Sequence, residues 1–129
     1  MTPLPHIMKG LRPLAFVATA APARAIAFYR DVIGLALVAD DAFAAIFDAA
    51  GVTLRLQKVE RLTPAPYTVF GWHADDIAPL VARLAAAGVS CERYPWMTQS
   101  PDGIWDAPDG DRVAWFKDPD GNLLSVSQE

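Results

Sequence analysis

Residues 112–128 read RVAWFKDPDGNLLSVSQ, two short apolar stretches on either side of a tight turn. Pro119 presets the first turn dihedral, Asp120 tolerates the next corner, and Gly121 can adopt the left-handed conformation that closes the turn. The flanking residues are rich in Val, Leu and aromatic side chains, which favour strands. The stretch therefore predicts a β-hairpin near the end of the chain.

The hairpin completes a pattern that occurs twice. In residues 14–56, a strand is followed by a helix that begins at Pro22, a favoured first-turn residue, and ends at Gly34. A strand near residues 35–39 and a hairpin around DAAG at 48–51 complete this half. The helix carries an apolar stripe formed by Ile26, Tyr29 and Ile33.

Residues 69–126 repeat the same order of elements. After a first strand, Asp75 or Asp76 is expected to cap a helix that ends at Gly88. A strand near residues 89–94 and the terminal hairpin follow. The apolar stripe of this helix is Ile77, Leu80, Val81 and Leu84.

The repeat predicts an α+β fold made of two paired βαβββ modules with curved mixed sheets around a cavity. We expect one domain over residues 1–129, with module one at about 11–58, a proline-containing linker at 59–67, and module two at about 68–128. Each helix should cover one face of its sheet. The two faces left open could then lie together around a hollow.

Composition excludes several function classes. The net charge is −4 and the pI is near 5.0, so a basic surface that follows nucleic-acid phosphates is not expected. No apolar run approaches the roughly 18 residues of a membrane span. The first residues, MTPLPHIMKGLRP, contain three prolines and no signal-peptide core, and Cys91 is the single cysteine. These features predict a cytoplasmic protein in which Cys91 is a small buried residue of a strand.

Three motifs carry a family resemblance: AIAFYRDVIGL at 25–35, ADDI at 74–77 and FKDPDGNLLSVSQ at 116–128. Together they resemble the vicinal oxygen chelate superfamily, the group of glyoxalases, bleomycin-resistance proteins and extradiol dioxygenases. The resemblance implies paired βαβββ modules and a homodimer. It also implies, for many members, a divalent metal held by His, Glu or Gln at four strand positions.

In this chain the four positions are Leu14, Arg55, Val69 and Ser125, and these residues do not suit a metal. Leucine and valine cannot coordinate, arginine is a fixed cation, and serine is a poor ligand for Zn, Fe or Mn. A shift of one residue in either direction restores no ligand. His73 and Asp75 share a strand face, but no second pair of suitable spacing accompanies them. We therefore expect no metal and no cofactor at Leu14, Arg55, Val69 and Ser125.

Side chains two residues apart on a strand share a face, so the neighbours of these positions should line the same cavity. The predicted lining is Leu14, Phe16, Phe43, Ala45, Arg55, Gln57, Val69, His73, Val113, Trp115 and Ser125. Trp96 and Trp105 lie on the loop at 94–111. They either form a lid that stacks on a flat or cationic ligand, or they fill the end of the cavity as core residues. Tyr29 and Trp72 are predicted to be core residues between helix and sheet.

Arg55 is the most informative of these residues, because a guanidinium in an apolar cavity requires an acid. The acid is either a ligand carboxylate or phosphate, or an internal partner. The candidate internal partners are Asp40, Asp41, Asp106 and Asp111. We predict that Arg55→Leu abolishes ligand binding or stabilises the fold. If both the ligand affinity and the melting temperature stay unchanged, Arg55 is a solvated surface group.

The sequence favours a metal-independent protein that binds a small aromatic or amphipathic molecule. An alternative is a lyase- or isomerase-type enzyme that uses His73 and Arg55 for general acid–base chemistry. A metal-dependent enzyme is disfavoured by the four unsuited positions. The identity of the ligand and the presence of catalysis are left open by the sequence.

Overall fold

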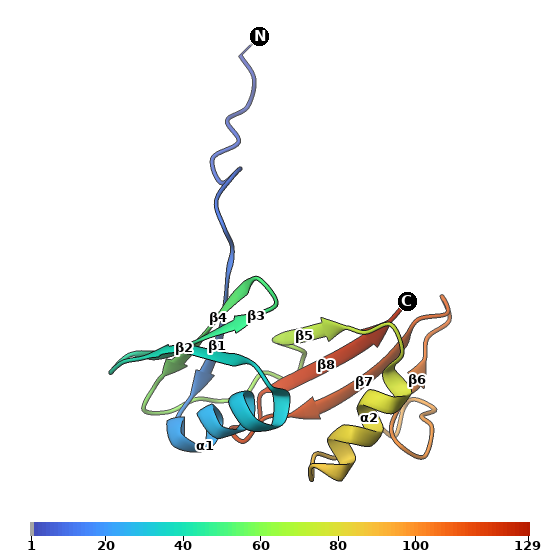
Figure 1. Cartoon of the computed structure of the whole chain (residues 1–129). Helices are drawn as coiled ribbons and strands as arrows, with labels where there is room; N and C mark the ends of the chain where they lie inside the picture. The colour runs from blue at the N-terminus through green and yellow to red at the C-terminus, as the bar shows by residue number, and fades with distance from the viewer. Residues whose placement is uncertain (1) are drawn as a thin grey trace.

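The computed structural model describes residues 2–129 and contains two four-stranded sheets (Figure 1). The first sheet has the order β1-β4-β3-β2, with β1 parallel to β4 and the other pairs antiparallel. Its strands are β1 (Leu14–Thr19), β2 (Ala36–Asp40), β3 (Ala44–Ala49) and β4 (Val52–Lys58). The second sheet repeats this arrangement in the order β5-β8-β7-β6. Its strands are β5 (Phe70–His73), β6 (Trp105–Asp106), β7 (Arg112–Lys117) and β8 (Leu123–Gln128). The predicted α+β fold of two paired modules is confirmed.

One helical segment precedes β2, and another follows β5. The first is α1 (Pro22–Ala27), which continues as a π-helical stretch, η1 (Phe28–Ile33), and ends at Gly34 with φ of 89°. The second is α2 (Ile77–Ala86), followed by Gly88 with φ of 86°. The predicted glycine ends of both helices are confirmed. No helix in residues 2–129 is long and apolar enough to cross a membrane.

The start of α2 differs from the prediction. Asp76 occupies the N-cap position, but its carboxylate makes no capping hydrogen bond. The Ile77 N–H donates instead to Oε1 of Gln128, at 2.9 Å. Because β8 lies next to β5, the end of the chain reaches the first turn of α2. The prediction that Asp75 or Asp76 caps the helix through its side chain is therefore wrong.

The predicted strand near residues 89–94 is also wrong, because this segment is irregular. The Gln99 side chain accepts a hydrogen bond from the Tyr94 N–H at 2.8 Å and donates to the Glu92 carbonyl at 2.9 Å. A side chain that bonds to these backbone groups competes with the backbone hydrogen bonds that a strand would need. The segment keeps one backbone bond to β7, from the Glu92 N–H to the Trp115 carbonyl at 2.7 Å, and the two-residue strand β6 forms the ladder next to β7.

A single apolar core joins the two modules. It contains Tyr29 and Phe47 from module one together with Phe116 and Leu124 from module two, all at most 1% exposed. Trp72 packs against this core, so the predicted core positions of Tyr29 and Trp72 are confirmed. Residues from the helix-facing sides of both sheets thus belong to one core. Their opposite, open faces point outward.

The turn between β7 and β8 connects the modules through hydrogen bonds. The buried Asp118 carboxylate accepts from the Tyr29 hydroxyl at 2.7 Å and from the Asn122 side-chain amide at 2.9 Å. It also accepts from the backbone N–H groups of Asp120 and Asn122, at 2.9 and 3.0 Å. Burial, together with Asp118, raises the pKa of Tyr29, so the phenol stays a donor.

Gly121 has φ of 86°, as the turn prediction required. Further bonds tie the turn to the end of β1 and the residue after it: Asp120 accepts from the Thr19 hydroxyl and the Ala20 N–H, and the Asn122 amide donates to the Ala18 carbonyl.

Candidate functional site

The strand register of the first sheet shows which residues lie on its open face, the face away from the helices. Leu14 lies opposite Thr53, and Phe16 lies opposite Arg55, so alternate residues of β1 and β4 share this face. Gln57 belongs to the same face. Ala45 was predicted to join it, but Ala45 pairs with Leu56 and is fully buried on the helix side, so that prediction is wrong. Phe43 precedes β3 and is exposed.

The open face of the second sheet is built around Ser125. Ser125 lies opposite Gly71 of β5 on one side and opposite Trp115 of β7 on the other. A Cβ atom on Gly71 would lie 2.9 Å from the Ser125 Oγ, so only glycine fits this close approach. Val69 precedes β5 and donates its N–H to the Leu123 carbonyl at 3.0 Å. Val113 lies opposite Ser127, on the same face as Trp115.

Four aromatic side chains cluster over this face; we call them the aromatic wall: Tyr94, Trp96, Trp105 and Trp115. The Tyr94 ring lies 4.9 Å from Trp96 and 5.7 Å from Trp115, measured between centroids, and Trp105 lies 6.0 Å from Trp115. Trp96 is 75% exposed, so it does not fill a cavity as a core residue. Trp105 is half-buried in β6. Only part of the wall is therefore covered within one chain.

A cavity of about 800 Å³ lies against the aromatic wall. Tyr94, Trp96 and Trp115 line one side of it, and the linker around Pro64 to Thr68 lines the other. An ion pair between Lys117 and Glu92, with a nitrogen–oxygen distance of 3.0 Å, also borders it. Apolar and aromatic lining with a few polar groups is typical of small-molecule sites.

The four family metal positions form two separate pairs. Leu14 and Arg55 lie on adjacent strands of the first sheet, and Val69 and Ser125 lie at adjacent strands of the second. Neither of the two cavities described combines residues from both open faces. Residues 2–129 contain no group of three or more His, Cys, Asp and Glu side chains that could hold a metal ion. The residues at these positions do not fit the divalent metal of other family members.

Arg55 does not form the internal ion pair that was considered. Among the acids that the sequence offered, Asp40 pairs with Lys58 at 2.6 Å and Asp106 pairs with Arg112 at 3.0 Å. In the part of the chain that the structure describes, no carboxylate lies within ion-pair distance of Arg55, although backbone hydrogen bonds and then Arg55 lower the pKa of Asp41. Its half-buried guanidinium remains available to a ligand or to another chain.

His73 and Cys91 do not join this site. His73 ends β5 opposite Ser127, so the register places it on the open face, but it does not line the cavity at the aromatic wall; it borders a second cavity at the edge strand β5 instead. Cys91 is half-buried in the irregular segment, not in the predicted strand, and burial raises the pKa of its thiol. A raised pKa keeps the thiol protonated near neutral pH, so Cys91 is not an activated nucleophile.

Comparison with known proteins agrees with this architecture. The model of the Glyoxalase/Bleomycin resistance protein/Dioxygenase superfamily matches residues 4–126. The chain belongs to this superfamily. The paired modules are therefore the glyoxalase-like arrangement that the sequence motifs indicated. No curated protein matches the chain in sequence.

Several solved glyoxalase-like structures share the fold. Lactoylglutathione lyase from Agrobacterium tumefaciens has a TM-score of 0.67 and 21% identity, over 90% of this chain and 92% of that chain. A bleomycin-binding protein complexed with bleomycin has a TM-score of 0.69 and 20% identity, over 92% and 98%. A fosfomycin resistance protein from Listeria monocytogenes has a TM-score of 0.72 and 14% identity, over 91% of each chain. At these identities the likeness concerns the fold alone.

Proposed function

We propose that this glyoxalase-superfamily protein binds a small, flat aromatic or amphipathic molecule without a metal ion. The observation that carries the proposal is the aromatic wall beside a cavity of about 800 Å³, with Trp96 75% exposed at its edge. An exposed indole next to Tyr94 and Trp115 can stack on a planar ligand at little cost in conformational entropy. A similar fold occurs both in a bleomycin-binding protein and in a lactoylglutathione lyase, so the proposal of binding rests on the aromatic wall and not on the fold.

The unsuited metal positions support the metal-free part of the proposal. Leu14 and Val69 offer no donor atom, and Arg55 repels a cation. No specific observation favours the acid–base alternative, because the structure describes no hydrogen bond from His73 to an orienting acid. The single half-buried cysteine agrees with the cytoplasmic location that we propose.

We propose further that the protein works as a homodimer in which a second copy covers the open faces. Residues 2–13 form an extended arm that runs away from both modules (Figure 1). The arm carries large apolar side chains that are 62–84% exposed: Leu4, Ile7, Met8 and Leu11. Leu14 and Phe16, on the adjoining open face, are 50% and 54% exposed. Fully burying one such side chain contributes about 1.5–3 kcal/mol, so covering the arm and this face favours association.

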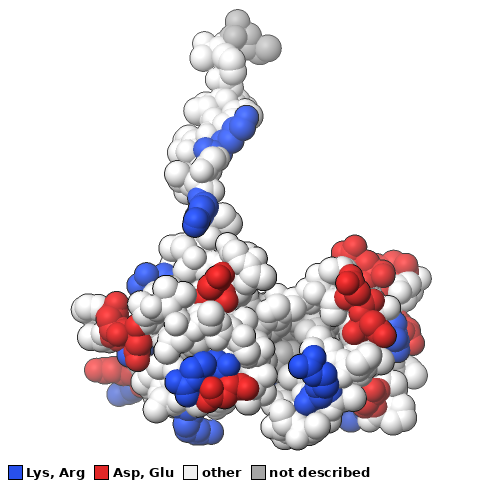
Figure 2. Space-filling model, viewed as in Figure 1, with Lys and Arg blue, Asp and Glu red and all other residues white. Residues whose placement is uncertain are grey.

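Charge supports the same arrangement. The arm contains Lys9 and Arg12 and no acidic residue, and both cations are exposed. Figure 2 shows this basic arm together with acidic side chains gathered at the far end of the second module. Contacts between the arm of one copy and the acidic module of the other would therefore be attractive.

A ligand screen tests the binding proposal. Uncharged and cationic planar aromatic compounds are added to the purified protein in the presence of EDTA, and the melting temperature is measured. We expect at least one class to raise the melting temperature by several degrees, since a ligand that binds the folded state stabilises it. Trp96→Ala should weaken the affinity for that ligand about tenfold, whereas Trp96→Phe should keep most of it. Unchanged affinity in Trp96→Ala, or binding that requires a stoichiometric metal, would contradict the proposal.

A further inference from the structure

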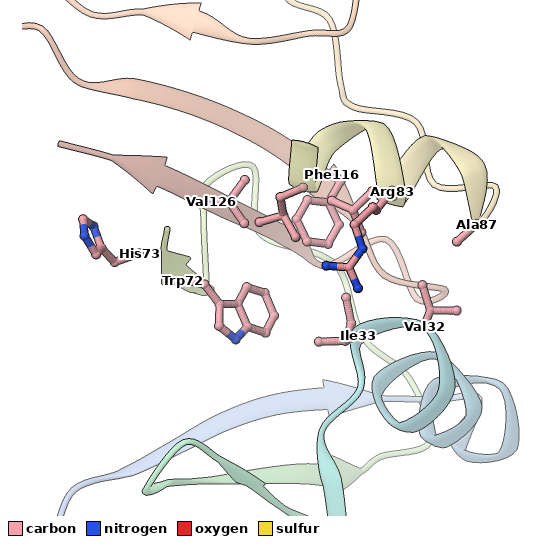
Figure 3. A pocket seen from close by; sticks show the side chains of 10 residues that line it. Val32, Ile33, Trp72, His73, Arg83, Ala87, Phe116 and Val126 are labelled. Atoms are coloured by element: carbon pink, nitrogen blue, oxygen red, sulfur yellow. The ribbon is translucent and has the colours of Figure 1, made fainter. Parts of the chain in front are cut away.

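A second cavity, of about 440 Å³, lies on the opposite side of the second sheet, between the two modules (Figure 3). Val32 and Ile33 of η1 form one wall, and Trp72, Phe116 and Val126 of the second sheet form another. Helix α2 supplies the remaining side. The cavity is distinct from the site against the aromatic wall, because these residues face the helix layer and not the open face.

Arg83 is the charged side chain at this cavity. In Figure 3 its guanidinium extends from α2 into the space between Ile33 and Trp72. Among the described residues that line the cavity, none is acidic, and Arg83 belongs to no ion pair of the described chain. Arg83 is exposed, so water solvates it in the free protein; because none of the lining residues is acidic, its guanidinium is free to bind an anion that enters the cavity.

The apolar part of the cavity is held in shape by aromatic packing. The Trp72 ring stacks on Phe116 with a centroid distance of 6.3 Å and an interplanar angle of 15°. Its edge contact with Phe70 is at 4.9 Å. Trp72 therefore presents a fixed indole to the cavity, and a flat ligand needs little rearrangement to contact it.

We propose that this cavity between the modules binds a small organic monoanion with a flat apolar body, such as an aromatic carboxylate. The carboxylate would be bound by Arg83, which can donate two parallel hydrogen bonds to it. The aromatic body would lie between Ile33 and Trp72. A single cation matches a single negative charge, and a volume of about 440 Å³ is in the range of small-molecule sites.

This site would link ligand binding to the packing of the modules. The ligand would contact η1 of module one and also α2 and β5 of module two, so a bound molecule would hold the two modules together. The proposal does not depend on the site at the aromatic wall. A second copy that covers the open faces would leave this cavity accessible, since the cavity lies on the helix side.

The test compares 2-naphthoate with its uncharged analogue 2-naphthalenemethanol, each titrated into the full-length protein by calorimetry. We expect 2-naphthoate to bind more tightly, and Arg83→Gln to weaken its binding about tenfold or more while leaving the neutral analogue unaffected. Arg24→Gln, an exposed arginine on α1, is the matched control and should change neither affinity.

Two further variants locate the site. Ile33→Trp should fill the cavity and abolish binding of both compounds, with circular dichroism checking that the variant is folded. Trp96→Ala should leave 2-naphthoate binding intact, which separates this cavity from the aromatic wall. No binding of 2-naphthoate, equal affinities in wild type and Arg83→Gln, or loss of binding in Trp96→Ala would each overturn the proposal.

Discussion

Asp118→Ala is expected to lower the free energy of unfolding by about 3–5 kcal/mol. The Asp118 carboxylate accepts four hydrogen bonds, one of them from the Tyr29 hydroxyl that crosses between the modules. Removing it leaves the fully buried Tyr29 without that acceptor and also loosens the turn between β7 and β8. Urea denaturation, followed by circular dichroism, measures the change.

Two variants serve as controls for this result. Tyr29→Phe removes one donor and leaves the others in place, so the expected loss is about 1–2 kcal/mol. Asp109→Ala alters a similar turn sequence, APDG at 107–110, where the exposed Asp109 accepts a bond from the Asp111 N–H. Its expected effect is within about 0.5 kcal/mol. A loss in Asp118→Ala as small as that in Asp109→Ala would show that the turn does not hold the modules together.

Deletion of residues 2–11 is expected to convert a dimer into a monomer and to weaken ligand binding at the aromatic wall by more than about tenfold. The deletion removes four exposed apolar side chains that, in the proposed dimer, contact the second copy. In the proposed dimer the second copy covers the open face that carries the ligand site, so loss of the dimer would also leave that site uncovered. Light scattering coupled to gel filtration gives the mass, and calorimetry with the ligand found in the screen gives the affinity.

A full-length control separates apolar contacts from chain length and charge. Replacing Leu4, Ile7, Met8 and Leu11 by serine should produce the same monomer as the deletion. Replacing Lys9 and Arg12 by glutamine should leave the dimer in place at physiological salt, because exposed charges contribute little. A monomeric wild-type protein, or a truncated protein that remains dimeric with full affinity, would refute the role of the arm.

The sequence by itself determined the features that depend on neighbouring residues. Pro22 at the start of the first helix, the glycines at 34 and 88, and the DPDG turn at 118–121 all act through local backbone dihedrals. The repeated order of strand, helix and strands followed from these local signals. The motifs then indicated the family that the comparison confirmed.

The tertiary structure decided what depends on distant residues. The Gln128 side chain, not that of Asp76, accepts from the first N–H of α2, and the Gln99 side chain bonds to the backbone of residues 92 and 94 where a strand was expected. Only the fold shows that the open faces point away from a shared core, and that Arg83 lies beside Trp72 and Ile33. Each of these arrangements joins segments far apart in the chain, and no local preference of the backbone specifies which of them meet.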